Sequence, residues 1–226
     1  MAGQLMAETK KPTGRPAVPV DPIDAIAQLI QAEIPDITEP AEYPDQPEPI
    51  PDEAWYVAFV MTGREDIVRR LMARYFPEVT VLVPRRSLRE RRRGKWKTVQ
   101  KTVFPGYVFF KVALSNRLYF FIRRVNRVIR ILEQERLPQQ VHAYEMQLLL
   151  KLTGGQDLIP FSRVHEIDGK VIVVSGPLAG CEGMIIGADR RKGRVKIRVM
   201  IGGESKTVDV GAEWIAEAGE TFPPMK

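Results

Sequence analysis

The sequence predicts an α+β protein with two folded domains. The first is an α/β sandwich, in which helices pack on an antiparallel sheet, and the second is a small all-β barrel. Three observations lead to this fold class. Strand-like and helical segments alternate between residues 54 and 152, the Gly-Gly and Pro of residues 153–160 (TGGQDLIP) indicate a linker, and four short strand-like runs follow.

The first domain, residues 54–152, is predicted from its periodicity. Residues 55–60 (WYVAFV) are typical of a strand, and the capping-box spacing of Thr62 and Glu65 indicates the start of a helix that ends at Phe76. Ser115 is expected to cap a second helix. The other expected elements are strands at 79–84, 105–112 and 128–132 and a last helix within 141–152.

The second domain, residues 164–218, carries the runs KVIVVS, EGMIIGA, RVKIRVMI and KTVDV. Short strands at this spacing predict a small SH3-like barrel. A flexible linker is expected at residues 153–163, and residues 219–226 are expected to be a tail.

Residues 1–53 differ from the rest in composition. They hold ten of the eighteen prolines, and eleven Asp/Glu against three Lys/Arg. Such a segment buries too little apolar surface to offset its ordering entropy, so we expect disorder. A short helix starting near Asp21–Pro22, used for docking, and an acidic head that covers the basic block are the alternatives.

The middle of the chain is strongly basic. Residues 54–158 carry 21 Lys/Arg against eight Asp/Glu, a balance that attracts polyanions such as nucleic acids. The one cysteine, Cys181, excludes an internal disulfide and fits a reducing compartment. Neither a membrane span nor a signal peptide is evident, so we expect a cytoplasmic protein without a membrane partner.

Two motifs resemble those of a known family. Trp55-Tyr56 and the run Phe104-Pro105-Gly106-Tyr107-Val108 resemble the N-terminal (NGN) domain of NusG-type transcription elongation factors. Residues 174–180 (VSGPLAG), with Gly183, Ile185 and the basic run that follows, resemble a KOW motif. Within the family, TGRE at 62–65 and GADRRKGRVKIR at 187–198 are most similar to the specialised LoaP-type antiterminators.

The resemblance implies that the chain binds RNA polymerase. In this family an apolar depression on the NGN domain grips the coiled-coil clamp of the polymerase. By match to the motifs, Phe104 and Tyr107, with Trp55 beside them, would line that depression. The residues alone leave a second interpretation, in which the aromatic rings belong to the core.

Basic segments are the candidate nucleic-acid contacts. In the first domain they are Arg85, Arg86, Arg89, Arg91, Arg92, Arg93, Lys95, Trp96 and Lys97. The resemblance places them near upstream or non-template DNA, where the cations would neutralise phosphates and Trp96 would stack on a base. In the barrel they are Arg190, Arg191, Lys192, Arg194, Lys196 and Arg198, which would contact nascent RNA. A solvated loop and an ordinary polar barrel face are the alternatives.

No catalytic constellation, phosphate loop or metal-ligand spacing is present in the sequence, so we expect a non-enzyme without cofactor or metal. The function that fits is a monomeric NusG-like factor that binds RNA polymerase and promotes processive elongation or antitermination, together with other elongation factors. The alternatives are a housekeeping elongation/termination factor and a general RNA-binding or ribosome-associated KOW module.

Overall fold

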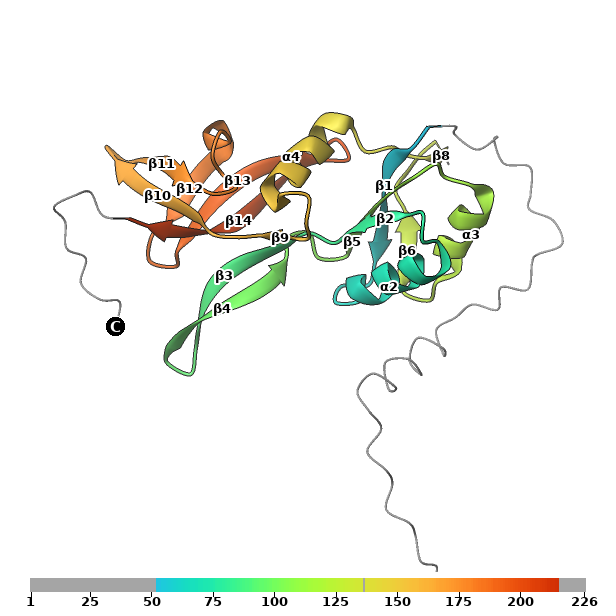
Figure 1. The fold of residues 1–226 in the computed structure, drawn as a ribbon, viewed down its shortest axis with the longest axis horizontal. Helices are drawn as coiled ribbons and strands as arrows, with labels where there is room; N and C mark the ends of the chain where they lie inside the picture. The colour runs from blue at the N-terminus through green and yellow to red at the C-terminus, as the bar shows by residue number, and fades with distance from the viewer. Residues whose placement is uncertain (1–51, 136, 216–226) are drawn as a thin grey trace, which may run out of the picture. The chain divides into compact units, whose positions relative to one another are not determined.

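The computed structural model describes residues 52–135 and 137–215 (Figure 1). The expectations for residues 1–51, including the disordered head and the helix near Asp21, lie outside the described residues, as does the tail from residue 216. Within the described ranges the chain is a mixed α+β protein with few helices and many strands, which confirms the predicted fold class.

A four-stranded antiparallel sheet forms the centre of the first domain. Its strands are β1 (Ala54–Val60), β2 (Thr80–Leu82), β5 (Tyr107–Val112) and β6 (Val128–Ile131), in the order β2-β5-β1-β6. Tyr56 pairs with Phe110 and Ala58 with Val108, and all four are buried. Because neighbouring residues alternate between faces, Val57 and Phe109 are buried on the opposite face of the sheet.

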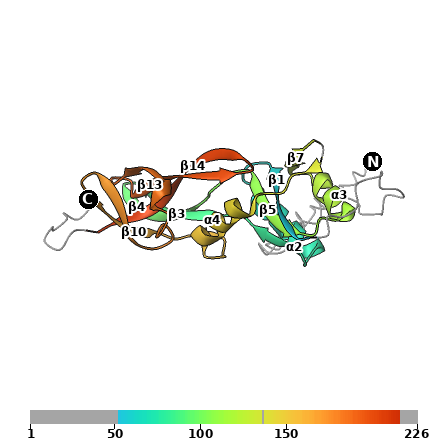
Figure 2. The ribbon, with the colours of Figure 1, turned by 90° about the horizontal axis from the view of Figure 1, so that it is seen from above.

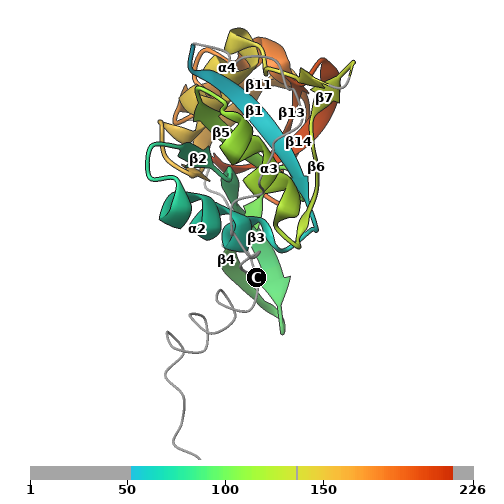
Figure 3. The same ribbon diagram turned by 90° about the vertical axis from the view of Figure 1, so that its right-hand side faces the viewer.

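Two helices, α2 (Glu65–Tyr75) and α3 (Asn116–Arg124), pack beside this sheet (Figure 3). Leu71 and Met72 of α2 and Ile122 of α3 are fully buried, as the helical periodicity predicts. The predicted capping box is wrong. Arg64 stands at the N-cap of α2 without a side-chain hydrogen bond, and the Glu65 carboxylate binds elsewhere.

Ser115 caps α3 as predicted, since its Oγ accepts a hydrogen bond from the Leu118 N–H at 3.3 Å. We expect Ser115→Ala to lower the free energy of unfolding by about 1 kcal/mol, because one N–H of the first turn loses its acceptor. Chemical denaturation measures this change. Ser175→Ala, at an exposed position at the end of a barrel strand, is the control. Equal stabilities of the two variants would contradict the capping role.

The basic stretch forms a β-hairpin. Strands β3 (Arg85–Arg92) and β4 (Lys95–Thr102) pair over their whole length, from Arg85 opposite Thr102 to Arg92 opposite Lys95. The two-residue connection, Arg93-Gly94, has positive φ angles of 51° and 79°, as a tight hairpin turn requires. The strand β9 (Leu158–Ile159) adds to β3 in parallel, within the segment that the sequence predicts as a linker.

The barrel is a five-stranded sheet in the order β11-β10-β14-β13-β12. The strands are β10 (Ser162–Ile167), β11 (Lys170–Ser175), β12 (Ile185–Asp189), β13 (Arg194–Ile201) and β14 (Glu204–Trp214), with a short 3-10 helix at Glu182–Met184. The strand β10 is one more than the sequence predicts. His165 and Glu166 interrupt its apolar pattern, which explains why it is not evident from composition.

The last helix, α4 (Ala143–Thr153), lies beside the barrel strands and the four-stranded sheet (Figure 2). Its Met146, Leu149 and Leu152 share one buried cluster with Val57 and Phe109 of the sheet and with apolar side chains of the barrel. A two-stranded ribbon, β7 (Glu133–Gln134) and β8 (Leu137–Pro138), precedes it.

Candidate functional site

Aromatic side chains surround the Pro-Gly turn before β5. The ring centroids of Phe104 and Tyr107 are 6.0 Å apart, and that of Phe59 lies 4.7 Å from Tyr107 in an edge-on arrangement. Phe109 lies 5.9 Å from Phe104. The turn therefore brings Phe104 and Tyr107 to the same side of the strand, which a regular strand with three-residue spacing does not do.

The aromatic residues differ in exposure. Phe104 is only 5% exposed and belongs to the core cluster, whereas Tyr107 and Phe59 are half-buried. In this arrangement Tyr107 and Phe59 are the more accessible residues, and the ring of Phe104 packs beside that of Tyr107. The role of these rings in partner binding stays a prediction.

Each accessible ring is paired with a cation. Arg130 places its Cζ 5.0 Å from the centroid of Phe59, and Lys206 of β14 places its Nζ 5.8 Å from that of Tyr107. A hydrogen bond to the Glu204 carboxylate raises the pKa of Lys206, and its contact with Tyr107 adds to this shift. A cation therefore lies beside each of these two rings.

Glu65 fixes the Pro-Gly turn. Its carboxylate is buried at the start of α2 and accepts the Gly106 N–H at 2.7 Å. Gly106 has a φ of +83°, and a Cβ there would lie 3.0 Å from the Val60 carbonyl oxygen, so both the conformation and the space favour glycine. This role is not evident from the sequence, where Glu65 fits a capping box.

Trp55 is half-buried and packs against the core cluster. Its carbonyl accepts the Val141 N–H at 2.7 Å, so the residue connects β1 to the segment before α4. The structure thus shows a bridging role for Trp55, and its proposed place beside Tyr107 in a partner interface stays a prediction.

The arginines at the base of the hairpin make ion pairs and hydrogen bonds with other parts of the same chain. Arg85 pairs with Asp66 of α2, and Arg86 donates to the backbone carbonyl of Asp209 on β14. Arg89 pairs with Glu213 at 2.8 Å and lies over the ring of Phe161. The contacts of Arg86 and Arg89 hold β3 against β14, the last barrel strand, whereas the Arg85 pair connects β3 to α2.

The tip of the hairpin is different. Five cationic side chains are exposed there: Arg91, Arg92, Arg93, Lys95 and Lys97. Trp96 is half-buried and pairs across the strands with Arg91. Arg92 and Lys101 share Glu90, and hydrogen bonds, first from Lys101 and then from Arg92, lower the pKa of that carboxyl. The five exposed cations outnumber this one carboxylate, and the indole of Trp96 lies beside them.

The barrel cations follow the predicted alternation. On β13 the side chains of Val195, Ile197 and Val199 are buried, whereas Arg194, Lys196 and the exposed Arg198 lie on the other face. The exposed Arg190, Arg191 and Lys192 lie on the turn that precedes β13.

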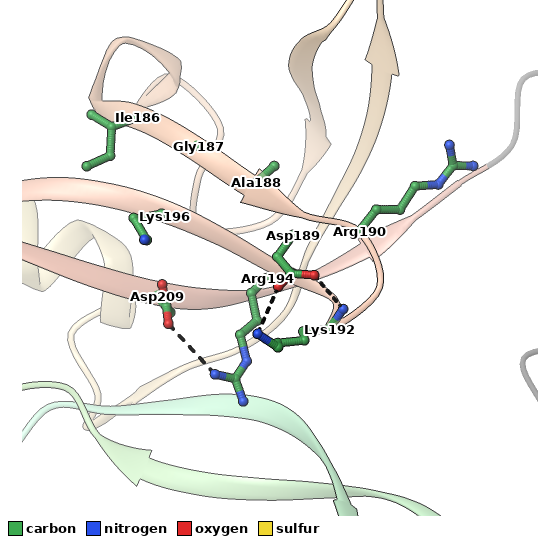
Figure 4. A pocket seen from close by; sticks show the side chains of 9 residues that line it. All are labelled: Ile186, Gly187, Ala188, Asp189, Arg190, Lys192, Arg194, Lys196 and Asp209. Carbon is green, nitrogen blue, oxygen red and sulfur yellow. Dashed lines mark hydrogen bonds and ion pairs between the residues drawn. The ribbon is translucent and has the colours of Figure 1, made fainter.

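A groove with a volume of about 560 Å³ runs over β12 and β13 (Figure 4). Its lining includes Arg194, Lys196 and Asp209, together with a Lys192–Asp189 pair whose atoms are 3.2 Å apart. The hydrogen bond from the Lys192 N–H is the main cause that lowers the pKa of Asp189. The groove gathers only part of the predicted barrel set, because Arg191 and Arg198 do not line it.

The described ranges contain no group of three His, Cys, Asp or Glu side chains that could hold a metal ion. None of the helices there has the length and hydropathy to cross a membrane.

A comparison with family models matches residues 53–150 to a model described as transcription termination factor nusG. Curated relatives named transcription termination/antitermination protein NusG are similar over most of their length. The Vibrio vulnificus protein is 28% identical over 172 residues, which is 71% of this chain and 93% of the relative. The Thermus thermophilus protein is 26% identical over 180 residues, 73% of this chain and 98% of the relative.

Among solved structures, one titled "Domain interaction in Thermotoga maritima NusG" covers 71% of this chain and 94% of its own. The two sequences are 24% identical, and the TM-score is 0.48.

Proposed function

We propose that this chain, which belongs to the NusG family, is a non-enzymatic factor that binds RNA polymerase in the cytoplasm and promotes processive elongation or antitermination. Members of this family are transcription termination/antitermination proteins. The expected polymerase element is the coiled-coil clamp, and the factor is expected to act as a monomer with other elongation factors.

The observation that carries the proposal is the aromatic surface of Phe59 and Tyr107 at the Pro-Gly turn. Both residues lie inside the matched range 53–150, and Tyr107 is half-buried with its ring beside that of the buried Phe104. Rigid aromatic rings on a packed base are the side chains that most often dominate the energy of protein interfaces. Phe104 would then act by supporting Tyr107.

We expect Tyr107→Ala to weaken retention of core RNA polymerase by about 30-fold, since truncation of a central aromatic anchor costs about 2 kcal/mol or more. The measurement compares retention of the polymerase on the immobilised full chain and on the variant. Phe104→Ala is not a suitable test by itself, because removal of a buried ring destabilises the fold.

The matched control is Tyr144→Ala, which removes a 58% exposed tyrosine on α4. Thermal unfolding of each variant shows whether the fold is kept. Equal retention by the wild type and folded Tyr107→Ala would contradict a polymerase contact at this ring. If the wild type does not retain polymerase even at low salt, the general RNA-binding module becomes the better interpretation.

The hairpin tip supports a second contact, with upstream or non-template DNA. Its five exposed cations would neutralise phosphates, and the indole of Trp96 would offer a surface on which a base can stack. Phosphate contacts position a protein but do not read sequence, so this contact would add affinity without specificity. Two weak contacts joined in one chain raise avidity.

The barrel is proposed to contact nascent RNA. The chain is also proposed to be a LoaP-type antiterminator, and both proposals depend on the same basic run of the barrel. Arg194 and Lys196 line a cationic groove, and they lie in the run GADRRKGRVKIR on which the subgroup resemblance depends. A housekeeping elongation factor remains the alternative. Read-through of a terminator downstream of one leader RNA, but not of unrelated terminators, would support the specialised role.

A further inference from the structure

The two basic segments meet at one aspartate. Arg86, on the hairpin, donates its Nη1 to the backbone carbonyl of Asp209 at 2.5 Å. Arg194, on β13, places its Nη1 3.7 Å from the Asp209 carboxylate. Residues 85–97 and 190–198 are more than 90 positions apart in the sequence. The fold therefore brings two guanidinium groups, one from each segment, to the same residue of β14.

Both guanidinium groups are short of acceptors. The Nε of Arg86 and the Nε of Arg194 are buried and have no hydrogen-bond partner among the described residues. The Arg194 side chain is only 23% exposed, and its ion pair with Asp209 is long. Since a guanidinium has five N–H donors in a fixed plane, this pair retains unused donor capacity in a partly desolvated place.

Electrostatics at the junction also favour an added anion. Burial lowers the pKa of the Arg86 guanidinium, the Asp209 carboxylate opposes this shift, and the like charge of Arg194 adds to it. Two cations thus share one carboxylate. The carboxylate hydrogen-bonds neither of them closely, because Arg86 donates to the backbone carbonyl of Asp209 and Arg194 lies 3.7 Å from the carboxylate.

The groove in Figure 4 opens beside this junction. Arg194 extends from β13 toward the hairpin strands, and Lys196 lies beside Asp209. Lys192 is turned toward Asp189, whereas the Arg190 side chain extends away from the groove. Lys196 and Arg194 line the groove together with Asp209, and Arg86 contacts Asp209 from the hairpin.

We propose that Arg86 and Arg194 bind one phosphodiester group of a nucleic-acid strand that lies in this groove, so that hairpin and barrel form a single site. The inference rests on the proposed nucleic-acid function and locates the binding site at the junction of the hairpin and the barrel. Planar guanidinium groups match phosphate oxygens with paired hydrogen bonds, which an ammonium does not do. RNA and DNA share this phosphodiester chemistry.

The site differs from a general cationic surface in one respect. Asp209 competes with the phosphate for Arg194, so the carboxylate lowers affinity while it keeps the empty site stable. If the junction is purely structural, a nucleic-acid strand does not bind there, and removal of the carboxylate lowers the stability of the fold. The proposed site therefore predicts tighter binding by Asp209→Asn, whereas a purely structural junction predicts lower stability without tighter binding.

The test measures fluorescence anisotropy of labelled oligouridylate and oligothymidylate, each about 12 nucleotides long, with the full chain over a range of salt concentrations. We expect Arg194→Gln and Arg86→Gln each to weaken binding about tenfold and to reduce the salt slope by about 1. Asp209→Asn is expected to bind about fivefold more tightly.

Arg124→Gln is the matched control, because Arg124 is an exposed arginine on α3 that belongs to neither basic segment and does not line the groove. Arg194→Lys keeps the charge and is expected to bind more weakly than the wild type, whereas a contribution of charge alone predicts no change. This variant keeps the test valid if Arg194→Gln unfolds.

If Arg86→Gln and Arg194→Gln bind both oligonucleotides more weakly, the contact is to the phosphate alone. If they bind only oligouridylate more weakly, the bound strand is RNA. If Arg86→Gln and Arg194→Gln bind as well as Arg124→Gln, or if the wild type binds neither probe at low salt, the proposal is overturned. Because polymerase is absent from this assay, its result does not depend on the retention experiment with Tyr107→Ala.

Discussion

Gly211→Ala is expected to lower the free energy of unfolding by about 2 kcal/mol and the midpoint of thermal unfolding by about 4–8 °C. A Cβ at Gly211 would lie 2.3 Å from the Ser87 carbonyl oxygen and 2.5 Å from ring carbons of Phe161. The nearest atom belongs to the backbone of β3, so no side-chain rotation removes the clash. The hairpin must then move away from β14.

The matched control is Gly187→Ala on β12, where an added Cβ meets no atom within 4 Å. Both variants replace a glycine by alanine in a strand of the barrel, so they differ only in the space around the added methyl group. Circular dichroism during heating measures both variants. If Gly211→Ala unfolds at the same temperature as Gly187→Ala, the close packing of β3 on β14 is absent in solution.

The same substitution connects stability to the proposed nucleic-acid site. Gly211 pairs with Arg194 across β13 and β14, and Ser87 follows Arg86 in the hairpin. Movement of β3 would therefore separate the two guanidinium groups without changing either. Weaker oligonucleotide binding by Gly211→Ala, at a temperature where it is still folded, would agree with that geometry.

Much of the fold can be predicted because its signals are local. Val68, Leu71 and Met72 recur at helical spacing and are buried in α2. Every second residue of β13 is apolar and buried, as its alternating pattern predicts. The strand β10 is missed, because polar residues follow its buried Val164 and its pairing with β14 depends on residues 50 positions later. Composition within one segment carries no information about such a partner.

The candidate site is predictable only in part for the same reason. Sequence reasoning treats the basic stretch as one cationic unit, whereas Arg85 and Arg89 pair with Asp66 and Glu213 and only the tip is exposed. Those carboxylates lie far from the stretch in sequence. Phe104 illustrates a second limit, since the spacing of an aromatic motif does not reveal which of its rings is buried.

Glu145→Ala is expected to lower the free energy of unfolding by about 3 kcal/mol. The Glu145 carboxylate, on α4, is 1% exposed and accepts the Gly202 and Gly203 N–H groups at 2.8 and 3.0 Å. Both glycines have positive φ, so their N–H groups converge on one anion. Alanine leaves two N–H donors of the turn between β13 and β14 without an acceptor.

Glu145→Gln separates the loss of acceptors from the loss of charge. The glutamine keeps one carbonyl oxygen as an acceptor but presents an amide N–H₂ to the second glycine, so we expect an intermediate stability. Glu78→Ala, at an exposed position after α2, is the control and is expected to change stability by less than about 0.5 kcal/mol. Urea denaturation of the three variants measures the differences. Equal stability of Glu145→Ala and Glu78→Ala would mean that α4 and the barrel turn separate before unfolding, because only then does water supply both missing acceptors.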